Sequence, residues 1–354
     1  PLADATRYNF WSSPVSATTL GAAFPNTNPY DFYTYNNSTW GTINDLDGTS
    51  SMTPGRGYTA TGDPTADYTT PQTFDIEFSG EVTNGNVQVS GLIGTYVTLG
   101  TPYPSGLSAS DIISNTNITA MHFWNHNTAT DYSQTTGNVA SDYAVYNGSG
   151  GAAATSGGSI PSGFIGTGQG FMAEFGTSQT NGTITFQNAW RSGDNDEFFS
   201  PLSNQEKVRT WLNLTNDQNA FNQILIGLFD HTTDGYDENY DAKRLKANPS
   251  LSFNSKLNGE DYVIQALAKP TINREKVIEL GVYAWQTGTY TIELDSLDNW
   301  PSDYTLYLED KQEDELINLL DNSTYTFDVT QTGAIGQRFY LRIGKTLDEA
   351  NGND

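Results

Sequence analysis

Short stretches in which apolar and polar residues alternate recur along the whole chain. Each is short and is bounded by Gly, Asn, Asp or Pro within a few residues, and Asn-Gly pairs such as Asn258-Gly259 tolerate the positive φ angles of tight hairpin turns. A strand with one buried face has a period of two, so this pattern predicts short antiparallel strands. The stretches are 73–78 (TFDIEF), 87–89 (VQV), 183–187 (TITFQ), 262–266 (YVIQA), 290–294 (YTIEL), 304–308 (YTLYL), 325–329 (YTFDV) and 338–343 (RFYLRI).

Helical patterns are scarce. Ser108 precedes ASDII and predicts a short helix with this serine as its N-cap. The stretch 310–320 (DKQEDELINLL) is compatible with a second helix or with a turn after a strand. Residues 152–162 (AAATSGGSIPS) are small and flexible in composition, which predicts a loop.

These patterns predict an all-β fold of two antiparallel, jelly-roll-like β-sandwich domains with only short helices or turns. The turn-rich stretch 199–205 (FSPLSNQ) precedes a new strand at Val208 and marks the boundary. We expect an N-terminal domain at 1–203, a C-terminal sandwich at 204–345 and a polar tail at 346–354.

Composition supports β structure and limits the partners. Aromatic residues make up 12% of the 354 residues and charged residues only 16%, while Met occurs three times. Aromatic side chains suit pleated, half-buried surfaces. The net charge of −25 disfavours binding to nucleic acid or to an anionic membrane surface, and it favours divalent cations and neutral or cationic partners.

The chain has no cysteine, which excludes disulfides, thiolate catalysis and Cys-ligated metal sites. No apolar run reaches the roughly 18 residues of a membrane-spanning helix, so we expect no membrane insertion. The first residues, PLADATRYNF, lack the basic and apolar regions of a signal peptide, and we expect the chain to be a fragment of a longer protein.

An acidic loop after the strand pattern at 221–229 is the strongest metal candidate. Asp230, Asp234, Asp237 and Asp241 could supply oxygen ligands to Ca²⁺. Their spacing departs from the alternate positions of an EF-hand, so a solvated acidic turn remains the alternative. Lesser candidates of the same kind are Asp45 with Asp47 and Asp194 with Asp196.

No catalytic constellation stands out. His122 and His126 would share a helix face, but in a strand they lie about 13 Å apart, too far to bind one metal ion. A glycosidase requires only two carboxylates, and none of the many possible pairs is singled out.

The densest aromatic cluster is a candidate ligand platform. Tyr30, Tyr33, Tyr35 and Trp40 follow one another within eleven residues. An aromatic ring presents an apolar face that matches the C–H face of a pyranose, so the cluster is a candidate for sugar stacking. Core packing is the alternative for each of these rings.

A set of motifs in conserved order along the chain resembles the region just upstream of the type A C-terminal sorting domain in Bacteroidota proteins exported by the type IX secretion system. The motifs are YNFWSSP (8–14), GRGY (55–58), GTPYPS (100–105), DYAVYN (142–147), GQGF (168–171), NAWR (188–191), RTWLNLT (209–215), DGYD (234–237) and RFYLR (338–342). The resemblance implies an extracellular or cell-surface module that uses the type IX machinery during export and carries no shared catalytic residues. It also implies that the chain is the exported body without its sorting signal.

Together these observations predict a non-catalytic surface module for adhesion, assembly or display. Its partners would be an extracellular glycan or protein, or further copies of itself. The first alternative is a carbohydrate-binding module of a polysaccharide-degrading system, and the second is a secreted hydrolase with an unidentified carboxylate pair.

Overall fold

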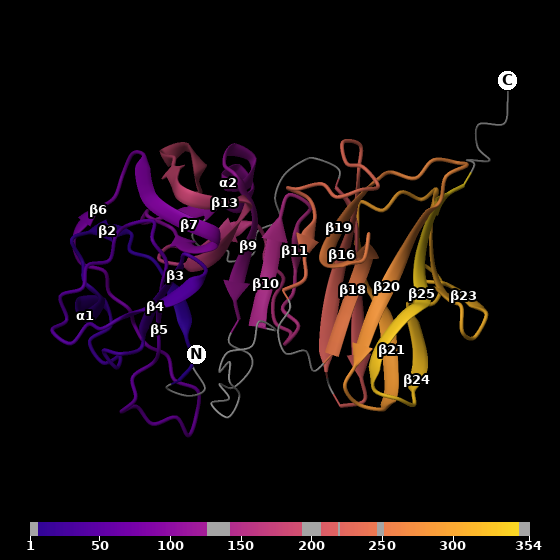
Figure 1. Ribbon diagram of the computed structural model, residues 1–354, viewed down its shortest axis with the longest axis horizontal. Coiled ribbons are helices and arrows are strands. Elements are labelled where there is room, and N and C mark those ends of the chain that lie inside the picture. Colours follow the sequence, from indigo (N-terminus) through magenta and orange to yellow (C-terminus); the bar gives the residue numbers. More distant parts are fainter. Residues whose placement is uncertain (1–5, 126–141, 193–206, 219, 246–250, 347–354) are drawn as a thin grey trace. The chain divides into compact units, whose positions relative to one another are not determined.

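The computed structural model describes residues 6–125, 142–192, 207–218, 220–245 and 251–346 (Figure 1). These residues form an all-β protein, as the alternation predicted, and they divide into two units. The first unit comprises residues 1–148 and 161–202, and the second comprises residues 149–160 and 203–354. Within the described ranges, no helix is long and apolar enough to cross a membrane.

The first unit is built from several small sheets. Its elements are β1 (Asn9–Trp11), β2 (Val15–Ser16), α1 (Leu20–Ala23), β3 (Phe32–Asn36), β4 (Thr39–Ile43), β5 (Tyr58–Ala60), β6 (Glu81–Val82), β7 (Val87–Gly100), β8 (Gly106–Ser108), α2 (Ala109–Asn115), β9 (Ile118–Trp124), β10 (Tyr143–Asn147), β12 (Phe164–Ile165), β13 (Gly170–Phe186), a 3₁₀ turn (Asn188–Trp190) and β14 (Arg191–Ser192). A four-stranded sheet has the order β1-β5-β3-β4, and a second sheet contains the neighbours β10-β9-β13-β7. Smaller sheets pair β12-β8-β14 and β2-β6.

The second unit is dominated by one sheet of eleven strands. The eleven strands of this sheet are β15 (Val208–Asn216), β16 (Phe221–Phe229), β17 (Ala242–Lys243), β18 (Leu251–Leu257), β19 (Glu260–Ala268), β20 (Lys276–Ala284), β21 (Gly288–Asp298), β22 (Tyr304–Asp310), β23 (Glu315–Asn318), β24 (Thr324–Val329) and β25 (Gly333–Lys345). The short strand β11 (Gly151–Ala152) also belongs to this unit but not to this sheet. The large sheet runs β23-β22-β25-β20-β18-β19-β16-β15-β21-β24, with β17 paired to β19. The strands β16 and β19 pair in parallel, which departs from the purely antiparallel expectation.

Side chains from the two ends of this large sheet meet across the core. The hydroxyl of Tyr325 on β24 donates to Asp310 on β22 at 2.9 Å, and the Phe327 and Phe339 ring centroids lie 4.5 Å apart. Since β24 and β22 lie near opposite ends of the strand order, the sheet curls back on itself. The resulting core contains fully buried large side chains such as Phe253 and Tyr290.

Most local predictions are confirmed. Ser108 caps α2 by accepting a hydrogen bond from the Asp111 amide at 3.1 Å. Asn258 and Gly259 both adopt positive φ in the hairpin between β18 and β19. The stretch 310–320 forms a turn and the strand β23 rather than a helix.

One local prediction is wrong. Residues 73–78 form no ladder, although Phe74, Ile76 and Phe78 alternate inward and the last two pack on a core cluster. Alternation reports burial on one side of an extended chain, and a strand also requires a partner edge. Residues 152–162 form a loop as predicted, apart from Ala152 at the end of a short strand, and Ala152–Ala154 are buried in the second unit.

The segment Ser149–Ile160 packs on the second unit through polar contacts to its backbone. The Trp211 indole donates to the Gly151 carbonyl at 2.8 Å, and the Ala153 amide donates to the Gln223 side chain at 3.0 Å. Small side chains let this backbone approach closely, and the two side chains satisfy polar groups that burial would otherwise leave unpaired.

Candidate functional site

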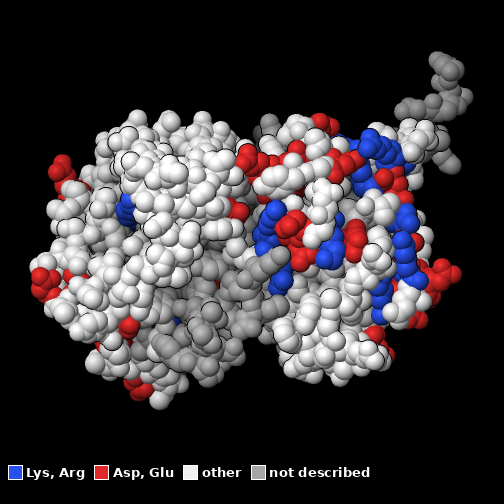
Figure 2. All heavy atoms as spheres, in the orientation of Figure 1, with Lys and Arg blue, Asp and Glu red and all other residues white. Residues whose placement is uncertain are grey.

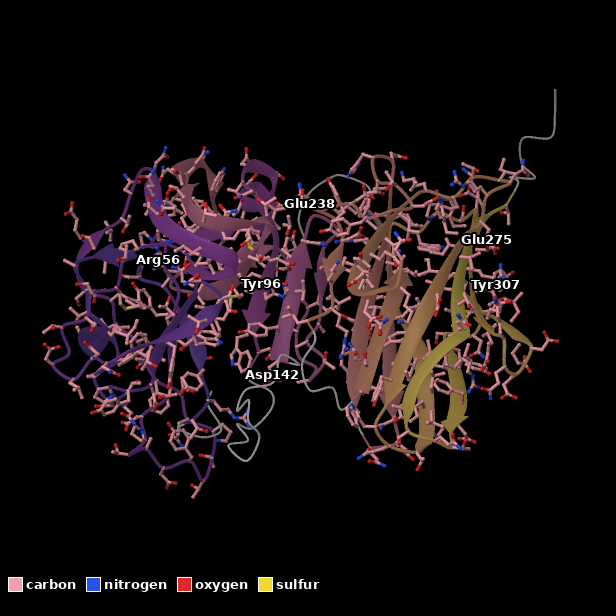
Figure 3. All side chains as sticks on the ribbon, in the orientation of Figure 1. Arg56, Tyr96, Asp142, Glu238, Glu275 and Tyr307 are labelled. Atoms are coloured by element: carbon pink, nitrogen blue, oxygen red, sulfur yellow. The ribbon has the colours of Figure 1, made fainter. Side chains whose placement is uncertain are left out.

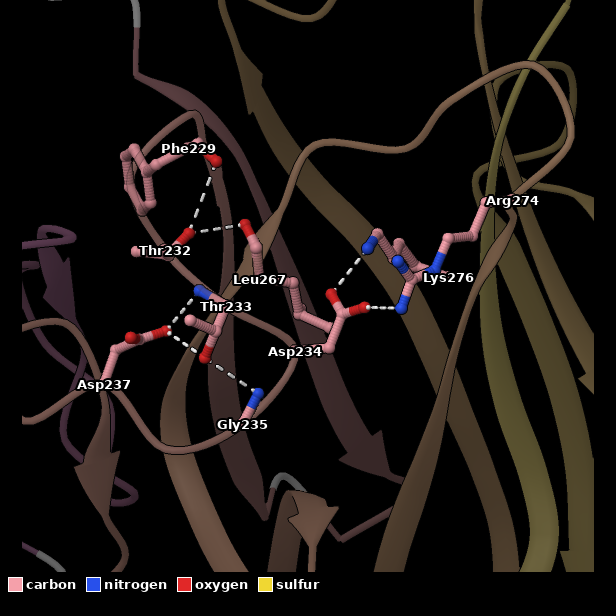
Figure 4. A network of polar contacts seen from close by, with 9 residues as sticks. All are labelled: Phe229, Thr232, Thr233, Asp234, Gly235, Asp237, Leu267, Arg274 and Lys276. Atoms are coloured by element: carbon pink, nitrogen blue, oxygen red, sulfur yellow. Dashed lines mark hydrogen bonds and ion pairs between the residues drawn. The ribbon is translucent and has the colours of Figure 1, made fainter.

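The predicted metal loop lies between β16 and β17, and its aspartates contact protein donors. Asp234 forms ion pairs with Lys276 and with Arg274, the latter at 3.0 Å (Figure 4). Asp230 pairs with Lys269 at 2.8 Å. These carboxylates therefore tie the loop to the strand β20 and its neighbouring turn.

The other two aspartates organise the loop backbone. Asp237 accepts hydrogen bonds from the amide and the hydroxyl of Thr233 at 2.7 and 3.2 Å (Figure 4). Asp241 is buried and accepts from the amides of Asp237 and Ala266, both at 2.6 Å. Burial raises the pKa of Asp241 to about 6, while its two backbone donors offset part of that effect.

Each of the four aspartates thus has at least one oxygen engaged by the protein. Among the described residues, no three acidic or histidine side chains are grouped so that they could hold a metal ion. Calcium binding by this loop stays a prediction. Of the lesser candidates, Asp194 and Asp196 lie outside the described residues, while buried Asp45 accepts a hydrogen bond from the Ser50 amide at 2.6 Å.

Three of the four predicted platform residues share one face of the hairpin β3–β4. Tyr33 and Tyr35 are two positions apart on β3, and Tyr35 lies directly opposite Trp40 on β4. Directly opposed residues project to the same side of a sheet. Tyr30, which is 53% exposed, precedes β3 in a turn where Asn28 accepts a hydrogen bond from its amide.

Edge-to-face contacts hold these rings in place. The Tyr35 and Trp40 centroids are 5.1 Å apart at 72°, and Tyr33 contacts Tyr8 at 5.7 Å and 72°. Phe10 on β1 extends the cluster to Trp40 at 6.0 Å. We call Tyr8, Phe10, Tyr33, Tyr35 and Trp40 the aromatic row.

The outer edge of the aromatic row is open to solvent. Trp40 is 43% exposed, and β4 is the last strand of its sheet. All residues of β4 except Ile43 are exposed, and none is charged. A rigid, exposed ring on an uncharged strand can stack on an apolar ligand face with little loss of side-chain entropy.

The sequence pattern did not identify Tyr8 and Phe10 as members of the aromatic row. The motif YNFW does carry a period-two signal, because Tyr8 and Phe10 alternate with Asn9. Phe10 pairs with Thr59, and Thr59 pairs with Tyr33, so Tyr8 and Phe10 project to the same face of the sheet as Tyr33. That pairing joins segments about fifty residues apart and has no signature in the sequence.

His122 has a structural environment in the second sheet of the first unit. It is fully buried, and its Nε2 lies 2.9 Å from a carboxylate oxygen of Glu174. The Tyr96 ring lies 5.8 Å from the imidazole, and Tyr96 is labelled on β7 in Figure 3. The pair bridges β9 and β13, whereas His126 lies outside the described residues.

Charge separates the two units. The first unit carries three of the 16 Lys and Arg residues, at Arg7, Arg56 and Arg191. In Figure 2 basic and acidic side chains are interspersed over the second unit, while most of the visible first unit is uncharged. The aromatic row therefore lies on the unit that is poorer in charged residues, and the charges that this unit carries are mostly acidic.

Comparison with known proteins gives a family and no named relative. No curated protein and no solved structure matches this sequence. Residues 3–343 match the model of the domain of unknown function DUF8693, and the chain therefore belongs to that family.

Proposed function

We propose that this chain is a cell-surface adhesion module that binds neutral glycans through the aromatic row. The observation that carries the proposal is the alignment of Tyr33, Tyr35 and the exposed Trp40 on one face of an uncharged edge hairpin. Successive rings on one face offer stacking surfaces to successive sugar units.

The surroundings of the aromatic row support a neutral ligand. Sugar hydroxyls form hydrogen bonds with the hydroxyl of Thr, and exposed Thr42 lies two positions from Trp40 on the same face of β4. A surface with few charges avoids the cost of removing water from ions when a neutral partner binds. The extracellular location and export by the type IX system remain expectations from the resemblance of the ordered motifs.

The test compares two exposed tryptophans. Trp40→Ala removes the open ring of the aromatic row, and Trp285→Ala removes a similarly exposed ring, 46% accessible and 4.9 Å from Tyr283 in the second unit. On an array of neutral plant and marine polysaccharides, we expect the wild type and Trp285→Ala to bind alike. Trp40→Ala should bind about tenfold more weakly, which corresponds to about 1.4 kcal/mol.

Other outcomes would change the proposal. Equal binding by Trp40→Ala and the wild type, or a silent array, counts against glycan adhesion through the aromatic row. Release of reducing ends from any polysaccharide would favour the hydrolase alternative instead.

A further inference from the structure

A pocket of about 260 Å³ lies in the first unit, on the face of the four-stranded sheet opposite the aromatic row. Asn9 and Trp11 of β1 line it, whereas Tyr8 and Phe10 point to the other side because successive side chains alternate. The pocket and the aromatic row are thus two separate features of one sheet.

Four chain segments build the pocket. They are β1, the residues after α1 (23–27), the residues at and after the end of β5 (60–63) and the extended segment 72–76. The last of these is the stretch that alternates without forming a ladder. Its position explains why an extended segment with inward apolar residues remains unpaired: it closes a wall of the pocket rather than extending a sheet.

The apolar part of the wall combines three aromatic rings with the smaller or aliphatic side chains of Ala23, Pro25, Ala60 and Ile76. Trp11, Phe24 and Phe74 line the pocket. The Trp11 and Phe24 centroids are 5.5 Å apart, and Phe74 contacts Tyr68 at 6.2 Å. Phe24 is buried, so this wall is supported from behind by core residues such as Phe32.

The polar part of the wall is mainly neutral. Six of its side chains carry amide or hydroxyl groups that both donate and accept hydrogen bonds: Asn9, Asn26, Thr27, Thr61, Gln72 and Thr73. Two carboxylates, Asp63 and Asp75, complete it, and none of the described residues that line the pocket is Lys or Arg.

Part of this polar wall is fixed in place by the protein. Thr27 donates to the Thr61 carbonyl at 2.8 Å. One oxygen of Asp63 accepts from the amide and hydroxyl of Thr65 at 2.8 and 2.7 Å, and the Tyr68 hydroxyl donates to the Asp63 carbonyl at 2.8 Å. Binding to a wall that is already ordered loses less conformational entropy.

We propose that this pocket binds a single neutral sugar ring, as a monosaccharide or as the terminal unit of a glycan. A sugar presents hydroxyls that each donate and accept, which matches the six neutral side chains, and a C–H face that matches the aromatic wall. An ammonium ligand only donates, so it would match the two carboxylates and leave the amide and hydroxyl donors unpaired. The volume lies just below the range of about 300–1,000 Å³ for drug-sized ligands, as a one-ring ligand requires.

The experiment detects contact between the intact chain and small sugars by saturation-transfer NMR. The probes are the methyl glycosides of glucose, galactose, mannose, fucose, xylose and N-acetylglucosamine, with methylammonium as the cationic, hydrogen-bond-donating probe. Asn26→Trp places a large ring at an exposed position of the pocket rim, and Asn117→Trp makes the same change at an exposed position that does not line it. Gln72→Ala is a second, milder pocket variant, and thermal unfolding checks that each variant folds.

The proposal expects at least one glycoside to bind the wild type, with Kd of about 1 mM. Asn26→Trp should abolish that signal and Gln72→Ala should weaken it about tenfold, while Asn117→Trp should retain it. Silence of all six glycosides, or a signal that survives both pocket variants, would overturn the proposal. Binding of methylammonium in place of any sugar would also overturn it.

The experiment can reject the pocket and the aromatic row independently of each other. A glycoside signal lost in Trp40→Ala and kept in Asn26→Trp would overturn the pocket site and leave the aromatic row standing. The reverse pattern would support the pocket, and the polysaccharide array would then decide the aromatic row alone.

Discussion

The two units use different means to stabilise the same kind of secondary structure. The second unit curls one large sheet and ties it together with charged side chains, including Arg342 between Glu309 and Glu275 at 2.9 and 2.7 Å (Glu275 is labelled in Figure 3). Among the described residues of the first unit, the contact closest to this kind is the one between the His122 imidazole and the Glu174 carboxylate at 2.9 Å. Its sheets are small and its surface is rich in aromatic and neutral polar groups.

This difference indicates a division of roles. Charges that pair with one another stabilise a scaffold, but they resist the loss of water that a neutral ligand would impose. Binding surfaces are accordingly depleted in charge and enriched in aromatic residues. The first unit fits this description, and the second unit fits that of a scaffold.

The largest expected effect comes from breaking the buried ion pair of the second unit. Arg338 donates to Asp310 at 2.7 Å, and both side chains are almost fully buried. Burial opposes the charge of Asp310, but the hydrogen bonds from Arg338 and Tyr325 outweigh it, and the pKa of Asp310 lies below its ordinary value. Arg338→Met leaves this carboxylate unpaired and should lower the free energy of unfolding by about 3–5 kcal/mol.

Hydrogen exchange resolved by segment measures this effect in β22, β24 and β25. The control is Arg342→Met, which removes a pair that is partly exposed and should cost less than about 1 kcal/mol. Equal losses in the two variants would contradict the idea that buried charge closes the curled sheet.

The next largest effect depends on pH. The pKa of Asp241 is about 6 in the folded chain against an ordinary value of 3.8, so the folded state binds this proton more tightly. Its contribution to stability should therefore rise as pH falls from about 6 to about 4, by up to about 3 kcal/mol. The free energy of unfolding of Asp241→Asn should lack this component, and parallel pH profiles of the wild type and the variant would refute the assignment.

A smaller loss of stability, of equal size in the two units, is expected when one buried tyrosine in each unit is changed to phenylalanine. The Tyr103 hydroxyl of the first unit donates to the Gly85 carbonyl at 2.6 Å, and the Tyr290 hydroxyl of the second donates to the Gln286 carbonyl at 2.9 Å. Each Tyr→Phe change should cost about 1 kcal/mol, because a partly buried hydrogen bond is lost. Segment-resolved exchange that found a loss in one unit alone would mean that the units differ in neutral packing and not only in charge.

The smallest expected effect is the change in stability and in glycan binding when the ionic strength is raised. Raising the ionic strength from about 0.1 M to about 1 M shortens the screening length to about 3 Å and weakens exposed pairs such as Lys269 with Asp230. The second unit should lose less than about 1 kcal/mol. Glycan binding by the first unit should change less than about twofold, and a steep salt dependence in titration calorimetry would indicate an ionic ligand instead.

Local patterns in the sequence were sufficient for the fold class and for most strands. The alternation in YTLYL places Tyr304, Leu306 and Leu308 inward on β22, because a period of two follows directly from the pleated backbone. The N-cap at Ser108 and the turn at Asn258-Gly259 likewise depend on a few neighbouring residues. The sequence also brought Tyr33, Tyr35 and Trp40 forward as one cluster, since they lie on a single hairpin.

Contacts between distant segments were decided only by the tertiary structure. No residue close to Asp310 in the sequence indicates that Arg338 pairs with it. The alternation of β22 alone would place an unpaired carboxylate in the core. The strand-like residues 73–78 pair with no strand, and residues 73–76 line the pocket instead. Period and turn chemistry are local properties of the chain, whereas pairing partners, buried charge and cavities depend on which segments meet when the chain folds.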